Sequence, residues 1–529
     1  MRHETKPLLP SETGPASSTT RLAPAAGAAL VRALFLALVA LLAVRLVALY
    51  LNGTDLFFDE AQYWFWSTEP AFGYYSKPPL IAWLIGATTA LCGDGEMCVR
   101  LASPVLHTLT ALAIFWLGRA LYDASVGVLA ALAYATLPGV SVSAGIISTD
   151  VPLLAAWAVA LAALVELLRT GPAASAATVG QASPGGASSW QPSLALGVAL
   201  GLGLNAKYAM AWFVMCLAVY LVATPTSRWL LRDSRLWAAL AVAALLIAPN
   251  IAWNSANAFA TFSHTADNAK WGGSLVNPGK AAEFFAAQFG VFGPILFGAL
   301  LVIGWRATKG RLAEADRLLL CFSVPLIAVI LAQAFVSRAH ANWAAPAYVA
   351  ASVLVVATML RDRAFGWMRA SFAVHLAVVA LVIAGTTLAG RASPPFGPDP
   401  FARTLGWRNV AEVVQMEVER ARKAGEPYAA VLTDDRPVTA ALLYYLRTSA
   451  IPVLAWQAGP YPTDHFQMTR GYAPARGAPL LLVSLGSPNE AVTGRFAAVA
   501  RLGEHTVAAG PSTSRTVHLV RLSADRQTR

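Results

Sequence analysis

Residues 28–66 read AALVRALFLALVALLAVRLVALYLNGTDLFFDEAQYWFW, a long apolar run followed by a polar loop and a cluster of aromatic side chains. The run 28–51 exceeds the roughly 20 apolar residues that a helix needs to cross a bilayer. It is too long for a signal-peptide core, and no small-residue cleavage site follows it. Aromatic side chains like those at 63–66 gather at membrane surfaces. We therefore expect a first span that leads into a helix resting on one face of a membrane.

The composition of the whole chain also indicates a membrane protein. Of its 529 residues, 57% are hydrophobic and 13% are charged, and the mean hydropathy is +0.55. So few charged residues cannot cover the surface of a soluble protein of this size. The net charge of +11 is explained by Lys and Arg in cytoplasmic loops, where they meet anionic lipids. No stripe of basic and aromatic residues predicts nucleic-acid binding, so membrane lipids are the expected partners of these charges.

The apolar runs predict about eleven membrane spans. They lie near residues 28–51, 99–121, 126–147, 150–169, 193–206, 208–223, 236–254, 284–305, 318–336, 341–360 and 371–390. The run from Ser193 to Ala223 is divided at Lys207, because a charged side chain is costly in lipid unless the chain turns there. The shorter run Pro79–Leu91 is expected to be an interfacial helix. The predicted fold class is an all-α polytopic membrane protein with an additional domain at its C-terminal end.

Loop charges predict the orientation of these spans. The tail 1–25 is polar, and its composition predicts disorder. Placing it in the cytoplasm keeps the basic residues at the ends of spans on the same side, as the positive-inside rule requires. They are Arg119, Arg169, Arg228, Arg232, Arg235, Arg306, Lys309, Arg311, Arg317, Arg361, Arg363 and Arg369. An odd number of spans then places residues 391–529 outside.

Residues 391–529 have the patterning of a soluble domain. The segments Tyr428–Leu432 and Pro479–Leu485 are predicted to be buried strands, and Val438–Leu446 is predicted to be a helix. We expect a small α/β domain there, after a membrane domain at 26–390 whose first outer loop is 52–98. The segment 171–192, rich in Ala, Gly and Ser, is predicted to be a flexible cytoplasmic linker.

Acidic residues occur in the loops that this orientation places outside. Asp59 fits a helix N-cap, with Gln62 completing a capping box. Alternatively, Asp59 and Glu60 are paired carboxylates beside an apolar surface, where one of them can have the shifted pKa of a general base. Asp150, which lies just before Pro152, fits a structural N-cap when taken alone.

Two lysines lie in the same loops. Lys77, followed by two prolines, can neutralise a phosphate at the level of the lipid headgroups, or it can simply extend its charge from the interface to water. Lys207 interrupts an apolar context and requires an anion, either from a ligand or from Asp59 or Asp150. A phosphate-bearing ligand is one explanation for both lysines.

Other polar residues on this face give weaker signals. His264 and Asp267 have the spacing of a metal pair on a helix, but two ligands do not define a site, and a solvated loop also explains them. Arg338, His340 and Asn342 precede a tryptophan, so anchoring at the interface explains them as well as ligand binding does.

The four cysteines fit no zinc pattern. Cys216 and Cys321 lie singly inside apolar runs, whereas Cys92 and Cys98 flank the turn sequence Gly93-Asp94-Gly95. A loop in an oxidising compartment would make Cys92 and Cys98 a disulfide. Two reduced, buried thiols are the alternative.

The segments FFDEAQYW at 57–64 and GYYSKPPL at 73–80 resemble the first outer loop of GT-C glycosyltransferases. The similar bacterial group includes protein O-mannosyltransferases, lipid A aminoarabinose transferases and lipid A core galacturonosyltransferases. Further matching segments are Val99–Ser103, Ser148–Asp150, Gly201–Tyr208, Pro249–Asn254 and Ala341–Trp343. The resemblance extends over roughly residues 28–390 in order and topology.

This resemblance implies an inverting transfer of a sugar from an undecaprenyl-phosphate-linked donor to an acceptor hydroxyl. Asp59 matches the catalytic acidic position, with Glu60 as its neighbour, and Asp150 matches an acidic residue of the second loop. Lys77 and Lys207 match donor-phosphate ligands. The other residues that we predict to bind substrate are Tyr75, Tyr208, His264, Arg338, His340 and Asn342.

The resemblance also implies a bacterial inner-membrane enzyme with a periplasmic C-terminal domain. Its acceptor would be lipid A or its core, another glycolipid or glycan, or a protein. Some members of the superfamily use a divalent metal, but no complete ligand set is found here, so we expect action without a metal or other cofactor.

Two other classes of function remain as alternatives. A transporter or lipid flippase would have charged or broken helices at mid-membrane and often an inverted repeat of its spans, neither of which is detected in the sequence. A structural membrane subunit would tolerate Asp59→Asn and Lys77→Ala.

Overall fold

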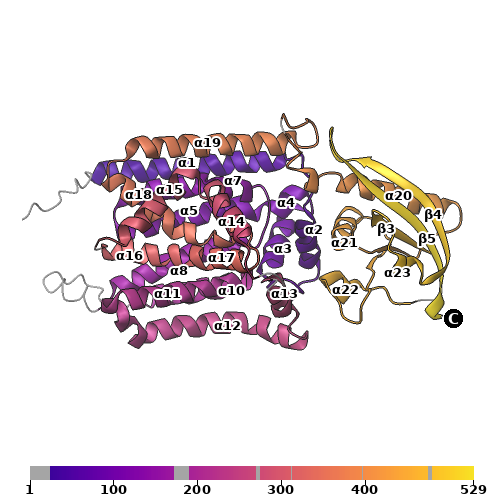
Figure 1. The fold of residues 1–529 in the computed structure, drawn as a ribbon, viewed down its shortest axis with the longest axis horizontal. Helices are drawn as coiled ribbons and strands as arrows, with labels where there is room; N and C mark the ends of the chain where they lie inside the picture. Colours follow the sequence, from indigo (N-terminus) through magenta and orange to yellow (C-terminus); the bar gives the residue numbers. More distant parts are fainter. Residues whose placement is uncertain are drawn as a thin grey trace, which may run out of the picture.

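The structure is a computed structural model that describes residues 24–171, 190–269, 275–310, 312–395, 397–474 and 479–528. The predicted tail 1–25 and linker 171–192 lie almost entirely outside the described residues. Figure 1 shows a bundle of roughly parallel helices at one end of the molecule and a smaller part containing a β-sheet at the other.

The helices of the bundle and its loops follow one another in chain order. They are α1 (Pro24–Tyr50), α2 (Phe58–Thr68), α3 (Leu80–Cys92), α4 (Glu96–Arg100), α5 (Ala102–Leu121), α6 (Ala124–Thr136), α7 (Pro138–Ser143), α8 (Asp150–Arg169), α10 (Gln191–Ala206), η1 (Tyr208–Ala211), α11 (Trp212–Ala223), η2 (Pro225–Arg232), α12 (Ser234–Ala256), α13 (Ala260–Ala269), α14 (Pro278–Val291), α15 (Pro294–Ala307), α16 (Glu314–Cys321), α17 (Val324–Val336), η3 (Ala341–Ala344), α18 (Ala347–Arg361) and α19 (Phe365–Leu388). The C-terminal part contains η4 (Ala402–Thr404), α20 (Trp407–Lys423), β1 (Ala430–Thr433), α21 (Arg436–Tyr445), β2 (Val453–Ala455), α22 (His465–Arg470), β3 (Leu480–Leu485), α23 (Glu490–Thr493), β4 (Phe496–Ala508), β5 (Ser514–Asp525) and η5 (Arg526–Thr528).

The chain is a multi-pass membrane protein. Within the described ranges, six helices are long and apolar enough to cross a bilayer, or up to seven if the bent pair α14–α15 is one span. The six are Gly27–Tyr50, Glu96–Leu121, Asp150–Arg169, Ser234–Ala256, Glu314–Val336 and Phe365–Leu388. Shorter apolar helices occupy the predicted spans 126–147, 208–223 and 341–360, and α10 occupies the predicted span 193–206.

Two predicted spans are not single straight helices. The span expected at 284–305 is bent by 116° between α14 and α15, because Gly293 adopts φ +87° and Pro294 begins a new helix. The span expected at 126–147 ends early, since α6 stops at Thr136 and Pro138 starts the short α7. The bundle therefore contains broken helices that hydropathy alone does not reveal.

Basic residues of the predicted cytoplasmic loops meet at the end of the bundle that lies away from the sheet. Arg235, at the start of α12, donates to Thr170 Oγ1 at the end of α8 over 2.9 Å. Arg361, at the end of α18, forms a 2.9 Å ion pair with Asp316 in α16. The helix ends that the sequence grouped by charge are thus neighbours in space.

The C-terminal part is built on a five-stranded sheet in the order β2-β1-β3-β5-β4. Strands β2, β1 and β3 are parallel, whereas β5 is antiparallel to both β3 and β4. Helices α20 and α21 pack on one face, where Val410 and Leu442 contact an apolar cluster that includes Leu481. The predicted strands at 428–432 and 479–485 and the predicted helix at 438–446 correspond to β1, β3 and α21, which confirms the α/β prediction.

A layer formed by α2, α3 and α4 separates the bundle from the sheet (Figure 1). The sequence predicted that the aromatic residues of this layer rest on the membrane surface, but in the structure they are packed inside the protein. Trp64 and Phe65 are buried and contact Tyr444 of α21 and Phe466 of α22, with ring centroids 4.9 Å and 5.5 Å apart. The aromatic cluster therefore joins the first outer loop to the C-terminal part.

Asp55 of the same loop holds the first turn of α20. Its Oδ2 atom accepts hydrogen bonds from the backbone N–H groups of Trp407 at 2.8 Å and Arg408 at 3.3 Å. These N–H groups have no partner within their own helix, and a negative charge is favourable at a helix N-terminus. A residue far away in the sequence thus caps α20.

Replacing Asp55 with Ala should open this junction without unfolding the bundle. We expect amide hydrogen exchange at Trp407 and Arg408 to become about tenfold faster, because both N–H groups lose their acceptor. Asp123→Ala removes the corresponding cap of α6, where the Asp123 side chain accepts from Val126 N. Mass spectrometry should show no faster exchange at 407–408 in that control, and unchanged exchange in Asp55→Ala would contradict the assignment.

Candidate active site

The two neighbouring carboxylates Asp59 and Glu60 have opposite environments. The Glu60 side chain is only 2% exposed and forms a two-pronged ion pair with Arg100, whose Nε and Nη2 lie 2.9 Å and 2.8 Å from its oxygens. Glu60 also accepts from the backbone N–H groups of Ile147 and Phe57, each at 2.9 Å. With its oxygens engaged in this way, Glu60 is a structural residue in this arrangement rather than a group that faces substrate.

Asp59 lies one residue earlier on α2 and remains accessible. Its side chain is 36% exposed, and Oδ1 accepts a 2.9 Å hydrogen bond from Nη1 of Arg436 in α21. The predicted capping role of Asp59 with Gln62 is wrong: Phe57 is the N-cap of α2, and the Glu60 carboxylate accepts from its backbone N–H. Asp59 therefore makes no cap bond, and its side chain contacts Arg436 instead.

Asp150, Lys207 and Asn342 form a second polar group. The Lys207 ammonium lies 2.7 Å from Asp150 Oδ1, and the Asn342 amide donates to Asp150 Oδ2 over 2.6 Å. Helix α10 ends at Ala206, and Lys207 is extended with φ −162° and ψ 133°, which turns its side chain toward α8. Asp150 makes no cap bond in α8, whose N-cap is Thr149. The anion that Lys207 needs is therefore Asp150.

Lys77 is a half-buried cation that lies near other positive charges. Burial, followed by repulsion from Lys207 and partly offset by attraction to Asp59 and Asp150, lowers the pKa of Lys77 to about 8. In the part of the chain that the structure describes, its ammonium makes no hydrogen bond or ion pair. A half-buried ammonium without a counterion is suited to an anionic ligand.

Arg338, His340 and His264 lie near these lysines. The Nε atom of Arg338 is buried and has no hydrogen-bond partner among the described residues. Burial lowers the pKa of His340, and the charges of Arg338, Lys207 and Lys77 lower it further. Burial and then Lys77 lower the pKa of His264 to about 4. Both imidazoles are therefore neutral near pH 7.

The two predicted tyrosines border the site. The Tyr75 ring lies 5.6 Å from the His264 ring, and its hydroxyl donates to the backbone of Pro462 over 3.2 Å. The Tyr208 hydroxyl donates to Asn250 over 2.7 Å, beside Lys207 in the chain. Within the described ranges, no group of three His, Cys, Asp or Glu side chains is placed to hold a metal ion.

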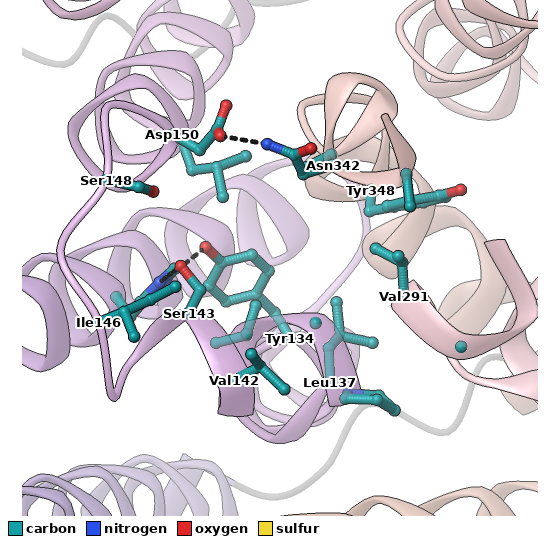
Figure 2. Close-up of a pocket in the computed structure, with 18 of the residues that line it drawn as sticks. Tyr134, Leu137, Val142, Ser143, Ile146, Ser148, Asp150, Val291, Asn342 and Tyr348 are labelled. Atoms are coloured by element: carbon teal, nitrogen blue, oxygen red, sulfur yellow. Dashed lines mark hydrogen bonds between the residues drawn. The ribbon is translucent and has the colours of Figure 1, made fainter. Parts of the chain in front are cut away.

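A cavity of about 570 Å³ begins beside the second polar group. Figure 2 shows the Asp150–Asn342 hydrogen bond at one side and the apolar side chains of Leu137, Val142 and Val291 beyond it. The wall comes mainly from α7, with further residues from α8, α14 and η3. A long apolar chain with a polar head matches this combination of surfaces.

The disulfide between Cys92 and Cys98 is present in the structure. It closes the turn that carries Asp94, whose Oδ1 accepts from the Trp64 indole over 2.8 Å and whose carbonyl accepts from the Tyr444 hydroxyl over 2.6 Å. The bridge therefore supports the layer that holds α2, at a distance from the polar groups.

Two residues of the site were not predicted from the sequence. Tyr63 is buried, and its pKa is raised well above the ordinary value by burial and then by the negative charge of Asp59, so its hydroxyl lies near that carboxylate. Tyr63 belongs to the aromatic motif after Asp59, so the sequence could have indicated its place in the site. Nothing in the sequence indicated Arg436, because it lies 377 residues from Asp59.

A polytopic helical bundle with a partly exposed carboxylate, unpaired cations and an apolar cavity is suited to a membrane enzyme that acts on a lipid with an anionic head group. Residues 76–253 match the family model described as dolichyl-phosphate-mannose-protein mannosyltransferase. The chain is 35% identical over 424 residues to the lipid A galacturonosyltransferase RgtD of Rhizobium johnstonii, covering 80% of this chain and 84% of that protein. The chain therefore belongs to the same family of GT-C glycosyltransferases as RgtD.

Solved structures agree in fold. The chain is similar to ArnT from Cupriavidus metallidurans in the apo state, with a TM-score of 0.60, 17% identity and coverage of 93% of this chain and 98% of ArnT. The ArnT structure bound to undecaprenyl phosphate gives a TM-score of 0.62 and 16% identity over 92% of this chain and 97% of ArnT. The membrane bundle and the C-terminal part therefore both belong to one shared fold.

Glu60→Gln and Asp59→Asn should have different effects on stability although the two residues are neighbours. Glu60→Gln leaves the Arg100 charge buried without a counterion and should lower the free energy of unfolding by about 3–5 kcal/mol. Asp59→Asn changes a partly exposed group and should leave stability near that of the unchanged protein. Thermal unfolding of the purified protein in detergent compares the two, and equal midpoints would contradict the structural role of Glu60.

Proposed function

We propose that the protein transfers a sugar from an undecaprenyl-phosphate-linked donor to a hydroxyl group of lipid A, and that the sugar is galacturonic acid. The observation that carries this proposal is the juxtaposition of Asp59 with an unpaired, half-buried Lys77, beside the Asp150 group at which an apolar cavity begins. The relative RgtD, a lipid A galacturonosyltransferase, supports the choice of sugar and acceptor. The fold shared with an ArnT structure that binds undecaprenyl phosphate supports the choice of donor.

The donor has three parts that match three surfaces of the site. Its isoprenoid tail is apolar and fits the cavity lined by Leu137, Val142 and Val291. Its phosphate would lie against Lys77, with Lys207 and Arg338 nearby, since charge-assisted hydrogen bonds favour phosphate oxygens. The sugar would then project toward Asp59, where α2 meets the C-terminal part.

The transfer needs one base and one site for a leaving anion. The acceptor oxygen attacks the anomeric carbon and loses its proton to the Asp59 carboxylate, while the bond between that carbon and the donor phosphate breaks. Undecaprenyl phosphate leaves with the bonding electron pair, and Lys77 stabilises the added charge. Attack from the face opposite the phosphate inverts the anomeric carbon, and no metal is needed for this balance.

The proposed orientation places this site on the periplasmic face of a bacterial inner membrane. The basic cluster that includes Arg235 and Arg361 lies at the opposite end of the bundle, which is the cytoplasmic end by the positive-inside rule. Chemistry at one surface favours a transferase over a carrier, whose ionisable groups would lie at mid-membrane.

Asp59→Asn should abolish transfer while the protein still inserts and folds. The amide cannot accept the acceptor proton, and losing a general base reduces the rate by about 100- to 10,000-fold. We would measure transfer in proteoliposomes containing undecaprenyl-phosphate-galacturonic acid and lipid A, using mass spectrometry of lipid A. Glu69→Gln, at the opposite end of α2, is the matched control and should remain active. Normal turnover by Asp59→Asn would remove Asp59 from the mechanism.

The lowered pKa of Lys77, about 8, predicts a pH dependence of donor binding. Lys77 is charged below that pKa and neutral above it, so the favourable contact with the donor phosphodiester is lost as pH rises. The KM for the donor should be constant below pH 7 and increase by up to about tenfold per pH unit above pH 8. Lys77→Arg keeps its charge and should give a flat profile across this range. The same rise in Lys77→Arg would assign the titration to another group.

A further inference from the structure

Arg436 connects the C-terminal part directly to the proposed base. It is the first residue of α21, and its Nη1 atom donates to Asp59 Oδ1 over 2.9 Å and to Gln62 Oε1 over 2.8 Å. The guanidinium also lies over the Phe58 ring, 4.8 Å from its centroid. Its side chain is 33% exposed, so this guanidinium borders the site and remains open to a ligand.

The arrangement uses only part of the guanidinium. A guanidinium has five N–H donors in a planar fork, and paired N–H groups match the two oxygens of a carboxylate. Within the described part of the chain, Nη1 makes both side-chain hydrogen bonds of Arg436, so Nε and Nη2 have no partner. A planar donor edge is therefore available beside Asp59.

The contact with Arg436 also engages one of the two oxygens of Asp59. A general base must present an oxygen to the proton that it accepts. In the structure, Asp59 Oδ1 accepts from Arg436, and among the described residues Oδ2 makes no hydrogen bond. An anionic group of a bound substrate would compete with Asp59 for this guanidinium.

We propose that Arg436 recognises a carboxylate group on the transferred sugar, and that this recognition releases Asp59 to act as base. The inference rests on the proposed function and names its specificity residue. Lys77, with Arg338 nearby, accounts for the donor phosphate, which a neutral or an acidic sugar carries alike. Arg436 supplies the additional cation that only a uronic acid needs. A neutral sugar leaves the Arg436–Asp59 pair intact, so its transfer is slow.

The test compares two donors in proteoliposomes that contain lipid A: undecaprenyl-phosphate-galacturonic acid and undecaprenyl-phosphate-galactose. The unchanged protein should prefer the acidic donor. Arg436→Gln should lower kcat/KM for the acidic donor by about 10- to 100-fold, the usual cost of losing a charged hydrogen bond, with most of the change in KM. The neutral donor should lose no more than about twofold or should gain, because Asp59 is no longer occupied. Arg436→Lys, which keeps the charge without the fork, should recover only part of the preference.

Arg470→Ala is the matched control. Arg470 lies in α22 of the same C-terminal part, pairs with Glu69 and contacts the Phe65 ring 5.3 Å from its guanidinium. It joins the same two parts of the protein away from Asp59, so its loss should leave the donor preference unchanged. An equal decrease for both donors in Arg436→Gln, or an unchanged preference, would overturn the role of Arg436. Failure of the unchanged protein to use either donor would instead overturn the proposed function.

Discussion

The buried ion pair between Glu60 and Arg100 fixes the geometry on which the rest of the site depends. The two side chains are almost fully buried, and each makes a further hydrogen bond: Glu60 accepts from the Ile147 N–H, and Arg100 donates to the Asp55 carbonyl. A pair in such surroundings has a large desolvation cost, so it is stable only with its remaining oxygens and N–H groups satisfied. The pair joins α2, the start of the α4–α5 span and the segment before α8. The pair therefore also fixes the positions of Asp59 and Asp150. Asp59 is next to Glu60, and Asp150 lies three residues after Ile147.

This arrangement divides the charges between structure and chemistry. Glu60 is neutralised by Arg100, and Asp150 is neutralised by Lys207 and also accepts a hydrogen bond from Asn342. Lys77 and the Nε atom of Arg338 have no counterpart among the described residues, which leaves an excess of positive charge near Lys207. A partly buried excess of this kind is unfavourable in the empty enzyme and is relieved by an anionic ligand. Binding of a lipid-linked phosphate removes this unfavourable electrostatic energy, and the free energy recovered adds to the affinity for the phosphate.

The sequence predicted most of the helical segments, because apolar runs of sufficient length have few alternatives in a membrane. It did not predict the 116° bend at Gly293, since hydropathy is the same on both sides of the bend. It predicted β1 and β3, whose residues are all or almost all buried, but not β4, whose middle residues are exposed and show no regular alternation. In the site, loop residues such as Asp59 and Lys77 could be identified because charges are rare near apolar runs. The roles of Asp59 and Glu60 could not be separated, because only the partner, Arg100 or Arg436, distinguishes two adjacent carboxylates.

The C-terminal part is physically continuous with the site rather than an appendage to the membrane bundle. Asp55 of the first outer loop caps α20, the aromatic side chains of α2 pack on α21 and α22, and α21 begins with the residue that contacts Asp59. Consequently a shift of the sheet relative to the bundle would move Arg436 relative to Asp59. The groups proposed to hold phosphate come from the bundle and its loops, and a phosphate is common to every lipid-linked donor. The group nearest to the position of the sugar comes from the C-terminal part. Under the proposed role of Arg436, changes in α21 would alter which sugar is accepted while leaving the phosphate and tail contacts intact, so one membrane scaffold could serve different donors.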